Sequence, residues 1–222
     1  MTEQRRPNNF RGPGPGEVIG PHTDLLREML AMLDWDVEIR LAQWSRSYNL
    51  ALSRPRTCVF STLRTEDREI LFKWVGPIGS TTLALIAKRD GDVPEIDDLE
   101  AARPYVIGVY TADAREIMLR NRGGYRLDVA TDDLLNALKL DAGRIDLWFT
   151  DLETLAQVEP ALRAKLEVAL RLTGEALYLA CNTRVSDMAI DQMNAALDTL
   201  KAAGADRRIW ASYAATGDID GR

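Results

Sequence analysis

Short apolar runs alternate with amphipathic stretches along most of this chain. Seven runs have the length and composition of strands, at residues 37–41, 57–61, 82–87, 106–110, 127–130, 145–149 and 177–181. Four stretches carry apolar positions at helical spacing, at residues 23–33, 113–121, 132–140 and 186–203. An alternation of strands with helices is typical of α/β folds.

The alternation restarts near residue 88, which divides the pattern into two halves. Residues 162–170 are compatible with either a helix or a strand. We therefore predict two α/β lobes, each a mainly parallel sheet with flanking helices.

Composition narrows the classes of function. The 222 residues are 46% hydrophobic, which is enough for a packed core, and the formal net charge of −6 argues against a general nucleic-acid surface. No apolar run approaches the length of a membrane span. A single histidine, His22, argues against most metal sites and against Ser-His or Cys-His catalysis. We expect neither a metal nor a cofactor.

The two cysteines, Cys58 and Cys181, lie far apart in the sequence, each inside an apolar run. They are able to pair in an oxidising compartment. Because free cysteines are commonly buried in apolar strands, we expect two free thiols.

The richest segment for chemistry is residues 60–78, where an apolar strand ends in a loop containing Ser61 and Thr62. An acidic helix start with Arg68 follows, and then a short aromatic strand. Hydroxyls, backbone N–H groups and a guanidinium at the end of a strand suit a small carboxylate, because arginine grips both carboxylate oxygens. The alternative is a surface Arg68 that pairs with a neighbouring acid.

Several segments, in their order and spacing, resemble a known family. They are Gly-Glu-Val-Ile-Gly at 16–20, Trp-Ser-Arg-Ser-Tyr at 44–48, the run 60–78, Gly-Val at 108–109 and Gly-Arg-Ile-Asp at 143–146. Across nearly the whole chain the sequence is similar to the family 3 extracellular solute-binding proteins, the polar amino-acid receptors of bacterial ABC importers.

This resemblance implies a two-lobed periplasmic-binding-protein-like fold of type II, with two hinge strands and lobes that close around a ligand. The first lobe would comprise residues 1–85 and 180–222, and the second residues 86–179. It implies capture of an amino acid or related carboxylate for a membrane ABC permease, by a monomeric protein without catalytic residues.

The resemblance also implies ligand contacts. Arg68 would grip the ligand carboxylate, with the loop Ser61, Thr62 and Leu63 beside it. Asp151 would bind the ammonium group, although an acid here is equally suited to capping the helix that follows. The other implied contacts are Thr111 and Phe10. Trp44, Tyr48 and Trp74 would form flat apolar walls of the cleft, although aromatic residues at strand ends more often belong to the core.

Three departures from the family pattern affect these expectations. The first strand of the family is absent before Met1, and Asn8 stands where a ligand-stacking ring is usual. Asp113 replaces a small residue that offers its amide to the carboxylate, so either Asp113 is a helix cap or the ligand is not a plain amino acid. The chain has no hydrophobic signal core, so we expect a periplasmic protein without its signal, or a cytoplasmic one if Met1 is the native start.

Other functions stay open at this point. The same module serves as the sensing input of signalling systems. A cyclohexadienyl-dehydratase-like enzyme would need a general acid or base, which Asp113, Asp151 or Glu153 would supply. A degenerate paralogue would bind nothing.

Overall fold

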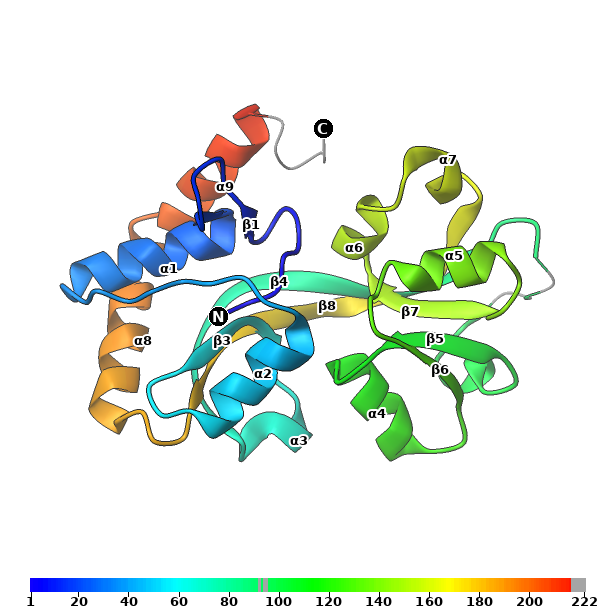
Figure 1. Ribbon diagram of the computed structural model, residues 1–222, viewed down its shortest axis with the longest axis horizontal. Coiled ribbons are helices and arrows are strands. Elements are labelled where there is room, and N and C mark those ends of the chain that lie inside the picture. Colours follow the sequence, from blue (N-terminus) through cyan, green and yellow to red (C-terminus); the bar gives the residue numbers. More distant parts are fainter. Residues whose placement is uncertain (92, 94–95, 217–222) are drawn as a thin grey trace. The chain divides into compact units, whose positions relative to one another are not determined.

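The computed structural model describes residues 1–91, 93 and 96–216. It divides into two compact units, unit 1 (Met1–Ser80 with Ala176–Arg222) and unit 2 (Thr81–Glu175). Two long strands, β4 (Phe72–Lys88) and β8 (Leu166–Asn182), run from one unit into the other (Figure 1). The boundaries expected from the sequence, after residues 85 and 179, fall within these same two strands. The prediction of an α/β fold with two lobes is confirmed.

Unit 1 contains the beginning of the chain, Met1–Ser80, and its end. Its elements are β1 (Phe10–Arg11), β2 (Val18–Ile19), α1 (Pro21–Met32), α2 (Trp44–Ser53), β3 (Cys58–Leu63), α3 (Glu66–Glu69), α8 (Asp187–Ala202) and α9 (Ala205–Thr216), with parts of β4 and β8. Pro21 occupies the first turn of α1, where a missing N–H costs nothing. Ser186 caps α8 by accepting from the N–H of Ala189.

The core of unit 1 packs α1, α8 and α9 against strands β3, β4 and β8. Leu25, Leu26 and Met29 supply the buried stripe of α1, at the spacing that the sequence predicts. They meet Met193 and Leu197 of α8, and Figure 1 shows the three helices gathered together. This packing holds β3 firmly, which matters because the candidate site begins at its end.

The strand predicted at residues 37–41 is wrong. Val37 is 51% exposed, and of these residues only Leu41 forms a β-bridge, with Thr2. The alternating pattern did not suffice because a strand also needs a neighbour along its length. Residues 1–2 lie beside β3, since the N–H of Phe60 donates to the Met1 carbonyl and the Thr2 hydroxyl donates to the Phe60 carbonyl.

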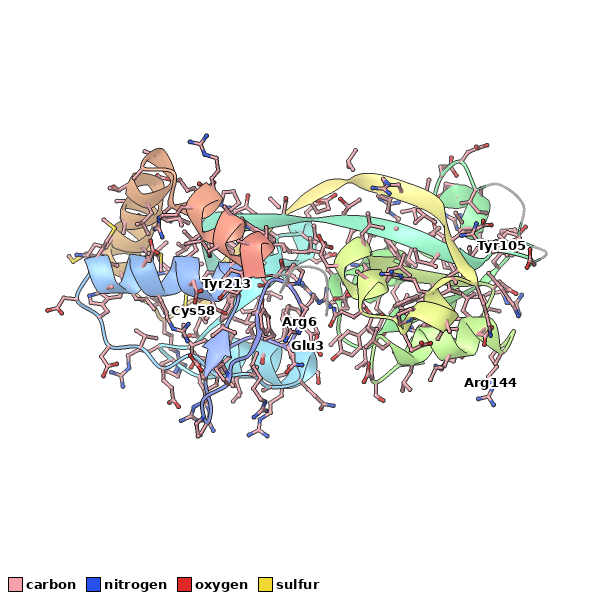
Figure 2. All side chains as sticks on the ribbon, turned by 90° about the horizontal axis from the view of Figure 1, so that it is seen from above. Glu3, Arg6, Cys58, Tyr105, Arg144 and Tyr213 are labelled. Carbon is pink, nitrogen blue, oxygen red and sulfur yellow. A yellow bond between two sulfur atoms is a disulfide. The ribbon has the colours of Figure 1, made fainter. Side chains whose placement is uncertain are left out.

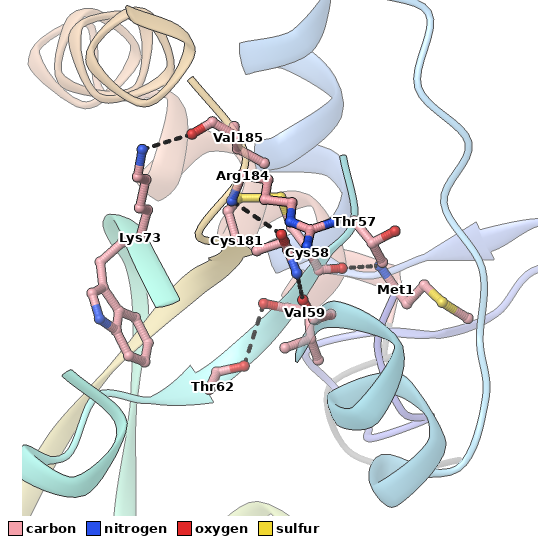
Figure 3. The surroundings of a disulfide bond; sticks show 12 residues. Met1, Thr57, Cys58, Val59, Thr62, Lys73, Cys181, Arg184 and Val185 are labelled. Atoms are coloured by element: carbon pink, nitrogen blue, oxygen red, sulfur yellow. Dashed lines mark hydrogen bonds between the residues drawn. A yellow bond between two sulfur atoms is a disulfide. The ribbon is translucent and has the colours of Figure 1, made fainter. Parts of the chain in front are cut away.

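Cys58 and Cys181 form a disulfide, so the expectation of two free thiols is wrong (Figure 3). β3 pairs antiparallel with β8, and the register places Cys58 directly opposite Cys181. Strand pairing brings the two residues together although 123 positions separate them in sequence. The sequence alone did not reveal which strands are neighbours, so it gave no reason to prefer the pair.

Unit 2 contains β5 (Val106–Tyr110), α4 (Ala114–Arg122), β6 (Arg126–Ala130), α5 (Leu135–Asp141), β7 (Leu147–Asp151), α6 (Leu152–Ala156), α7 (Pro160–Arg163) and the short η1 (Glu100–Ala102). β5 pairs in parallel with both β6 and β7. The expected parallel sheet is found here, whereas β4 pairs antiparallel with β7. The three parallel strands therefore end at one edge of unit 2.

The core of unit 2 lies beneath α5, α6 and α7. Trp148, Ile86 and Leu140 are fully buried in it, together with Ile145 and Leu166. The segment 162–170, left open by the sequence, contains the end of α7 and the start of β8. Among the described residues, no helix is both long enough and apolar enough to cross a membrane.

Candidate functional site

The candidate site of unit 1 begins where β3 ends. Ser61 has a φ of 58°, a left-handed conformation that is uncommon for a residue other than glycine, and the register of β3 with β8 shifts between Val59 and Thr62. The Ser61 hydroxyl donates to Asn9 Oδ1 at 2.6 Å and lies 2.9 Å from His22 Nδ1. Side chains from three segments thus fix this turn of the backbone.

Thr62, Leu63 and Arg68 continue the same corner. The Thr62 hydroxyl is buried and donates to the Val59 carbonyl. Arg68 donates from Nη1 to the Leu63 carbonyl at 3.4 Å. Although Arg68 lies on the short helix α3, it is only 1% exposed. The alternative of an Arg68 on the protein surface is therefore excluded.

The Arg68 guanidinium packs on aromatic rings. Its central carbon lies 5.5 Å from the ring centre of Trp44 and 4.8 Å from that of Tyr48, both on α2. A cation at this distance is attracted to the face of an aromatic ring. The edge of the guanidinium is the part that recognises a carboxylate.

These rings belong to a longer set, which we call the aromatic row: Trp44, Tyr48, Phe72, Trp74 and Tyr178. Successive members have ring centres 5.7, 5.3, 5.7 and 6.0 Å apart, mostly edge to face. Arg64 lies 5.5 Å from both Trp74 and Tyr178 while it pairs with Glu69. Four of these rings are buried and Tyr178 is half-buried, so the row is an apolar part of unit 1 with an arginine near each end.

The loop before β1 contributes a different arrangement. The Arg6 guanidinium lies 3.8 Å from the centre of the Phe10 ring, and Tyr213 meets the same ring edge to face at 6.1 Å. Figure 2 labels Arg6 and Tyr213. Asn8 is 1% exposed, and neither polar atom of its side chain has a hydrogen-bond partner among the described residues.

His22 is the buried titratable group of this region. It lies at the start of α1, and burial lowers the pKa of His22 to about 4. Because Ser61 gives its proton to Asn9, His22 Nδ1 donates to Ser61, and the ring is neutral. A Cβ on Gly79 would come within 2.1 Å of His22 Nε2, so the ring needs glycine at this position.

In unit 2, Thr111 and Asp113 follow β5 at the edge where the parallel strands end. The N–H of Thr111 donates to the Ala130 carbonyl, and Ala112 has a φ of 58°. Asp113 is the N-cap of α4, since its carboxylate accepts from the N–H of Arg115. The sequence left two explanations for Asp113, a helix cap or a ligand that is not a plain amino acid. The structure shows that Asp113 is a helix cap.

Asp151 ends β7 and caps α6 by accepting from the N–H of Thr154 at 2.8 Å. It also accepts from Arg115 Nη1 at 3.1 Å. Arg115 lies 2.6 Å from Asp113 and 3.1 Å from Asp133. We call these four residues the Arg115 cluster: Asp113, Arg115, Asp133 and Asp151.

Electrostatics hold the Arg115 cluster together. Burial lowers the pKa of Arg115, but the charges of the three carboxylates outweigh it and leave the pKa well above its ordinary value. No group of histidine, cysteine, aspartate or glutamate side chains among the described residues is arranged to hold a metal ion.

The structure thus places the expected contacts in separate groups. Trp44, Trp74 and Arg68 join in one corner of unit 1 with Thr62 and Leu63, and Phe10 lies beneath Arg6. Thr111 and Asp151 belong to unit 2. Sequence reasoning missed Phe72, Tyr178, Arg115 and Asp133. The alternation of Phe72 with Trp74 was a usable signal, because residues two apart share a strand face.

No protein-family model matches the chain, and no curated protein matches it. Solved structures do. An ancestral arginine-binding protein bound to arginine superposes with a TM-score of 0.79 at 21% identity, covering 96% of this chain and 95% of that one. A histidine kinase sensor domain with similarity to periplasmic binding proteins gives a TM-score of 0.83 at 20% identity, covering 96% and 93%.

A third solved structure is an ancestral amino-acid-binding protein described as a precursor of cyclohexadienyl dehydratase. It superposes with a TM-score of 0.75 at 18% identity, covering 96% of this chain and 92% of that one. At these identities the similarity establishes the fold, which is that of the periplasmic binding proteins.

Proposed function

We propose that this protein is the solute-binding component of a bacterial ABC importer and that it captures a small carboxylate, such as an amino acid or a related acid. The observation that carries the proposal is the position of Arg68. Its guanidinium is buried on the faces of Trp44 and Tyr48 at the end of β3. A guanidinium is a planar fork of N–H donors that matches the two oxygens of a carboxylate.

Two further observations support ligand binding at this corner. The aromatic row places apolar side chains beside Arg68, and pockets for small molecules combine apolar walls with a few polar groups. Two of the solved structures described above are amino-acid-binding proteins with the same fold. The family resemblance of the sequence agrees with both.

We further propose a periplasmic location. The disulfide between Cys58 and Cys181 supports this location, because disulfides form and persist in oxidising compartments and are rare in the bacterial cytosol.

A sensory role is the second candidate, because a histidine kinase sensor domain superposes on the chain with a TM-score of 0.83. The neighbouring genes discriminate the two roles: a permease gene favours transport, whereas a kinase or cyclase gene favours sensing. A dehydratase is less supported, since Asp113 and Asp151, two of the acids it would use, both accept from Arg115.

The test is a thermal-shift screen of the purified protein against amino acids, hydroxy acids and other small carboxylates. A ligand present at a hundred times its dissociation constant stabilises a protein by about 2.7 kcal/mol, which raises its melting temperature by several degrees. We expect at least one carboxylate to do so and Arg68→Ala to abolish the shift.

The matched control is Arg46→Ala, which removes an exposed arginine from α2, the helix that carries Trp44 and Tyr48. This variant should retain the shift. Binding that survives Arg68→Ala, or no response from the intact protein to any carboxylate, would contradict the proposal.

A further inference from the structure

The end of β3 is bent by one extra residue. Between the paired residues Val59 and Thr62, two residues of β3 stand opposite one residue of β8, and the second of the two is Ser61, with a φ of 58°. A bulge of this kind redirects the strand and its side chains. The left-handed conformation is unfavourable for serine, so it persists only where neighbouring groups hold it.

Asn9 has an orientation that decides every hydrogen bond around Ser61. Its Nδ2 donates to the Glu3 carbonyl and to Thr2 Oγ1, the latter at 3.1 Å. Because a carbonyl only accepts, the amide nitrogen faces Glu3 and the amide oxygen is left to face Ser61. The Ser61 hydroxyl therefore donates to Asn9 Oδ1 at 2.6 Å, and its only proton is used in this bond.

His22 and Thr2 complete the set. With the Ser61 proton directed at Asn9, His22 Nδ1 is the donor to the Ser61 oxygen at 2.9 Å. At the other end, the Thr2 hydroxyl donates to the Phe60 carbonyl at 3.0 Å. Phe60 directly precedes Ser61, so the hydrogen bonds run in one direction from His22 and return to the backbone beside the bend. We call Thr2, Asn9, Ser61 and His22 the Ser61 network.

Burial strengthens the Ser61 network. Thr2 and Asn9 are 1% exposed and His22 is 0% exposed. The His22 ring is held in turn by Trp210 of α9, which meets it edge to face at 6.1 Å. The loss of one partner would leave a buried polar atom unsatisfied, which costs more than a solvent-exposed hydrogen bond contributes.

We infer that the Ser61 network is a positioning device for the carboxylate site: it holds the left-handed bend in the free protein, so that the corner is formed before a ligand arrives. The inference rests on the proposed function. The corner is continuous with Arg68, whose Nη1 donates to the Leu63 carbonyl two residues after the bend. His22 acts on the site through Ser61 and is a positioning residue.

The same hydrogen bonds change the role expected of the two hydroxyls in this loop. A carboxylate needs donors, but the Ser61 proton is directed at Asn9, and the Thr62 hydroxyl donates to the Val59 carbonyl. Ser61 is therefore also a positioning residue, and its hydroxyl does not bind the ligand.

The first experiment needs no ligand and measures amide hydrogen exchange of residues 60–64, with the amides of β5 in unit 2 as the internal reference. His22→Leu removes the donor to Ser61 and should accelerate exchange at the corner about tenfold relative to β5. His22→Asn keeps an N–H donor at this place and should restore slow exchange. The matched control is Thr23→Val, because Thr23 is equally buried and its hydroxyl has no hydrogen-bond partner among the described residues. Unchanged exchange in His22→Leu would overturn the inference.

The second experiment uses glycine at position 61, since glycine adopts a positive φ without strain and needs no network to hold it. Calorimetric titration measures the affinity for L-glutamate, L-leucine, L-arginine and succinate. His22→Leu should weaken binding about tenfold in the wild-type background and leave it almost unchanged in the Ser61→Gly background. Ser61→Gly should bind as the wild type does. Ser61→Ala, which keeps the strain and lacks the hydroxyl, should bind about tenfold more weakly.

The outcomes separate the inference from the proposed function. Equal losses from His22→Leu in both backgrounds would mean that His22 has only a general structural role, and a large loss in Ser61→Gly alone would mean that the hydroxyl contacts the ligand. Either result overturns the inference and leaves the proposed function standing. If His22→Leu does not fold, the comparison of Ser61→Gly with Ser61→Ala decides. If the intact protein binds none of the four carboxylates, the positioning role falls with the proposed function, and the exchange experiment alone shows whether the network holds the bend.

Discussion

Arg68 in unit 1 and Arg115 in unit 2 are each 1% exposed, yet their surroundings differ in kind. The Arg68 guanidinium lies over the rings of Trp44 and Tyr48. Arg115 directs its N–H groups at Asp113, Asp133 and Asp151. A guanidinium stacks on an aromatic ring through its face, and it forms ion pairs through the N–H groups at its edge.

The difference separates two uses of a buried charge. Aromatic rings attract a cation to their faces without carrying a formal charge of their own, as Trp44 and Tyr48 do for Arg68. Carboxylates at hydrogen-bond distance neutralise Arg115, so its contribution is to the structure of unit 2. Burial and residue type are the same, and the partners decide the role.

The largest effect should come from removing Arg115. Arg115→Met leaves three buried carboxylates without their cation, and breaking a buried ion pair in this way costs roughly 3–5 kcal/mol. Arg68→Met, which loses ring stacking, should cost about 1–2 kcal/mol. Urea unfolding of the two variants measures the contrast. Adding Asp133→Asn to Arg115→Met should recover part of the loss, and equal costs for the two single variants would contradict the distinction between the two arginines.

The disulfide should produce the next largest effect, confined to unit 1. It joins β3 to β8, and replacing both Cys58 and Cys181 by alanine should cost roughly 2–5 kcal/mol. Hydrogen exchange should accelerate in β3 and β8 before it does in the strands of unit 2. A thiol assay of the unreduced, unfolded protein provides the control, and two titratable thiols would show that the bond is absent.

These two features also show what the sequence was able to predict. The alternation of apolar runs predicted the α/β fold and the strand at residues 57–61, because periodicity is a local property. The disulfide and the Arg115 cluster depend on which strands are neighbours, and this is a long-range property. Asp113, Asp133 and Asp151 stand at or just after the ends of three different strands, so no local pattern unites them.

More of the candidate site of unit 1 could be predicted from the sequence. Ser61, Thr62 and Arg68 lie within eight positions of one another, and a single segment carried them together. Tyr178 was missed because it reaches the aromatic row from β8, more than a hundred residues later. The strand predicted at residues 37–41 was wrong because an alternating pattern predicts a strand face without showing that a neighbouring strand exists.

Acid should weaken unit 1 through His22. Burial lowers the pKa of His22 to about 4, whereas an exposed histidine titrates near 6.5, so between these values the unfolded chain binds the proton and the folded protein does not. The contribution of the neutral His22 ring to the free energy of unfolding is fully present above pH 6.5 and is lost as the pH falls toward 4. A change from pH 7 to pH 4.5 should cost about 2–3 kcal/mol from this group alone.

The measurement is the difference in urea stability between the two pH values for the wild type and for His22→Asn. Asparagine places an amide where His22 Nδ1 donates to Ser61, and it does not titrate. The variant should lose less stability on acidification than the wild type. The same loss in both proteins would mean that other groups carry the acid sensitivity.

The smallest effect, and the one with the opposite sign, should come from Asn8. Its amide is buried without a hydrogen-bond partner among the described residues, so Asn8→Leu should stabilise the free protein by about 1 kcal/mol. Its neighbour Asn9 bonds Thr2 and Ser61, so Asn9→Leu should instead destabilise it. Thermal melts of the two variants without ligand measure this pair of opposite shifts. If Asn8 contacts the solute, Asn8→Leu also weakens binding, because the same amide then lowers the stability of the free protein and contributes to the affinity for the solute. A destabilised Asn8→Leu would contradict this prediction, because it would mean that the amide of Asn8 contributes to the stability of the folded protein.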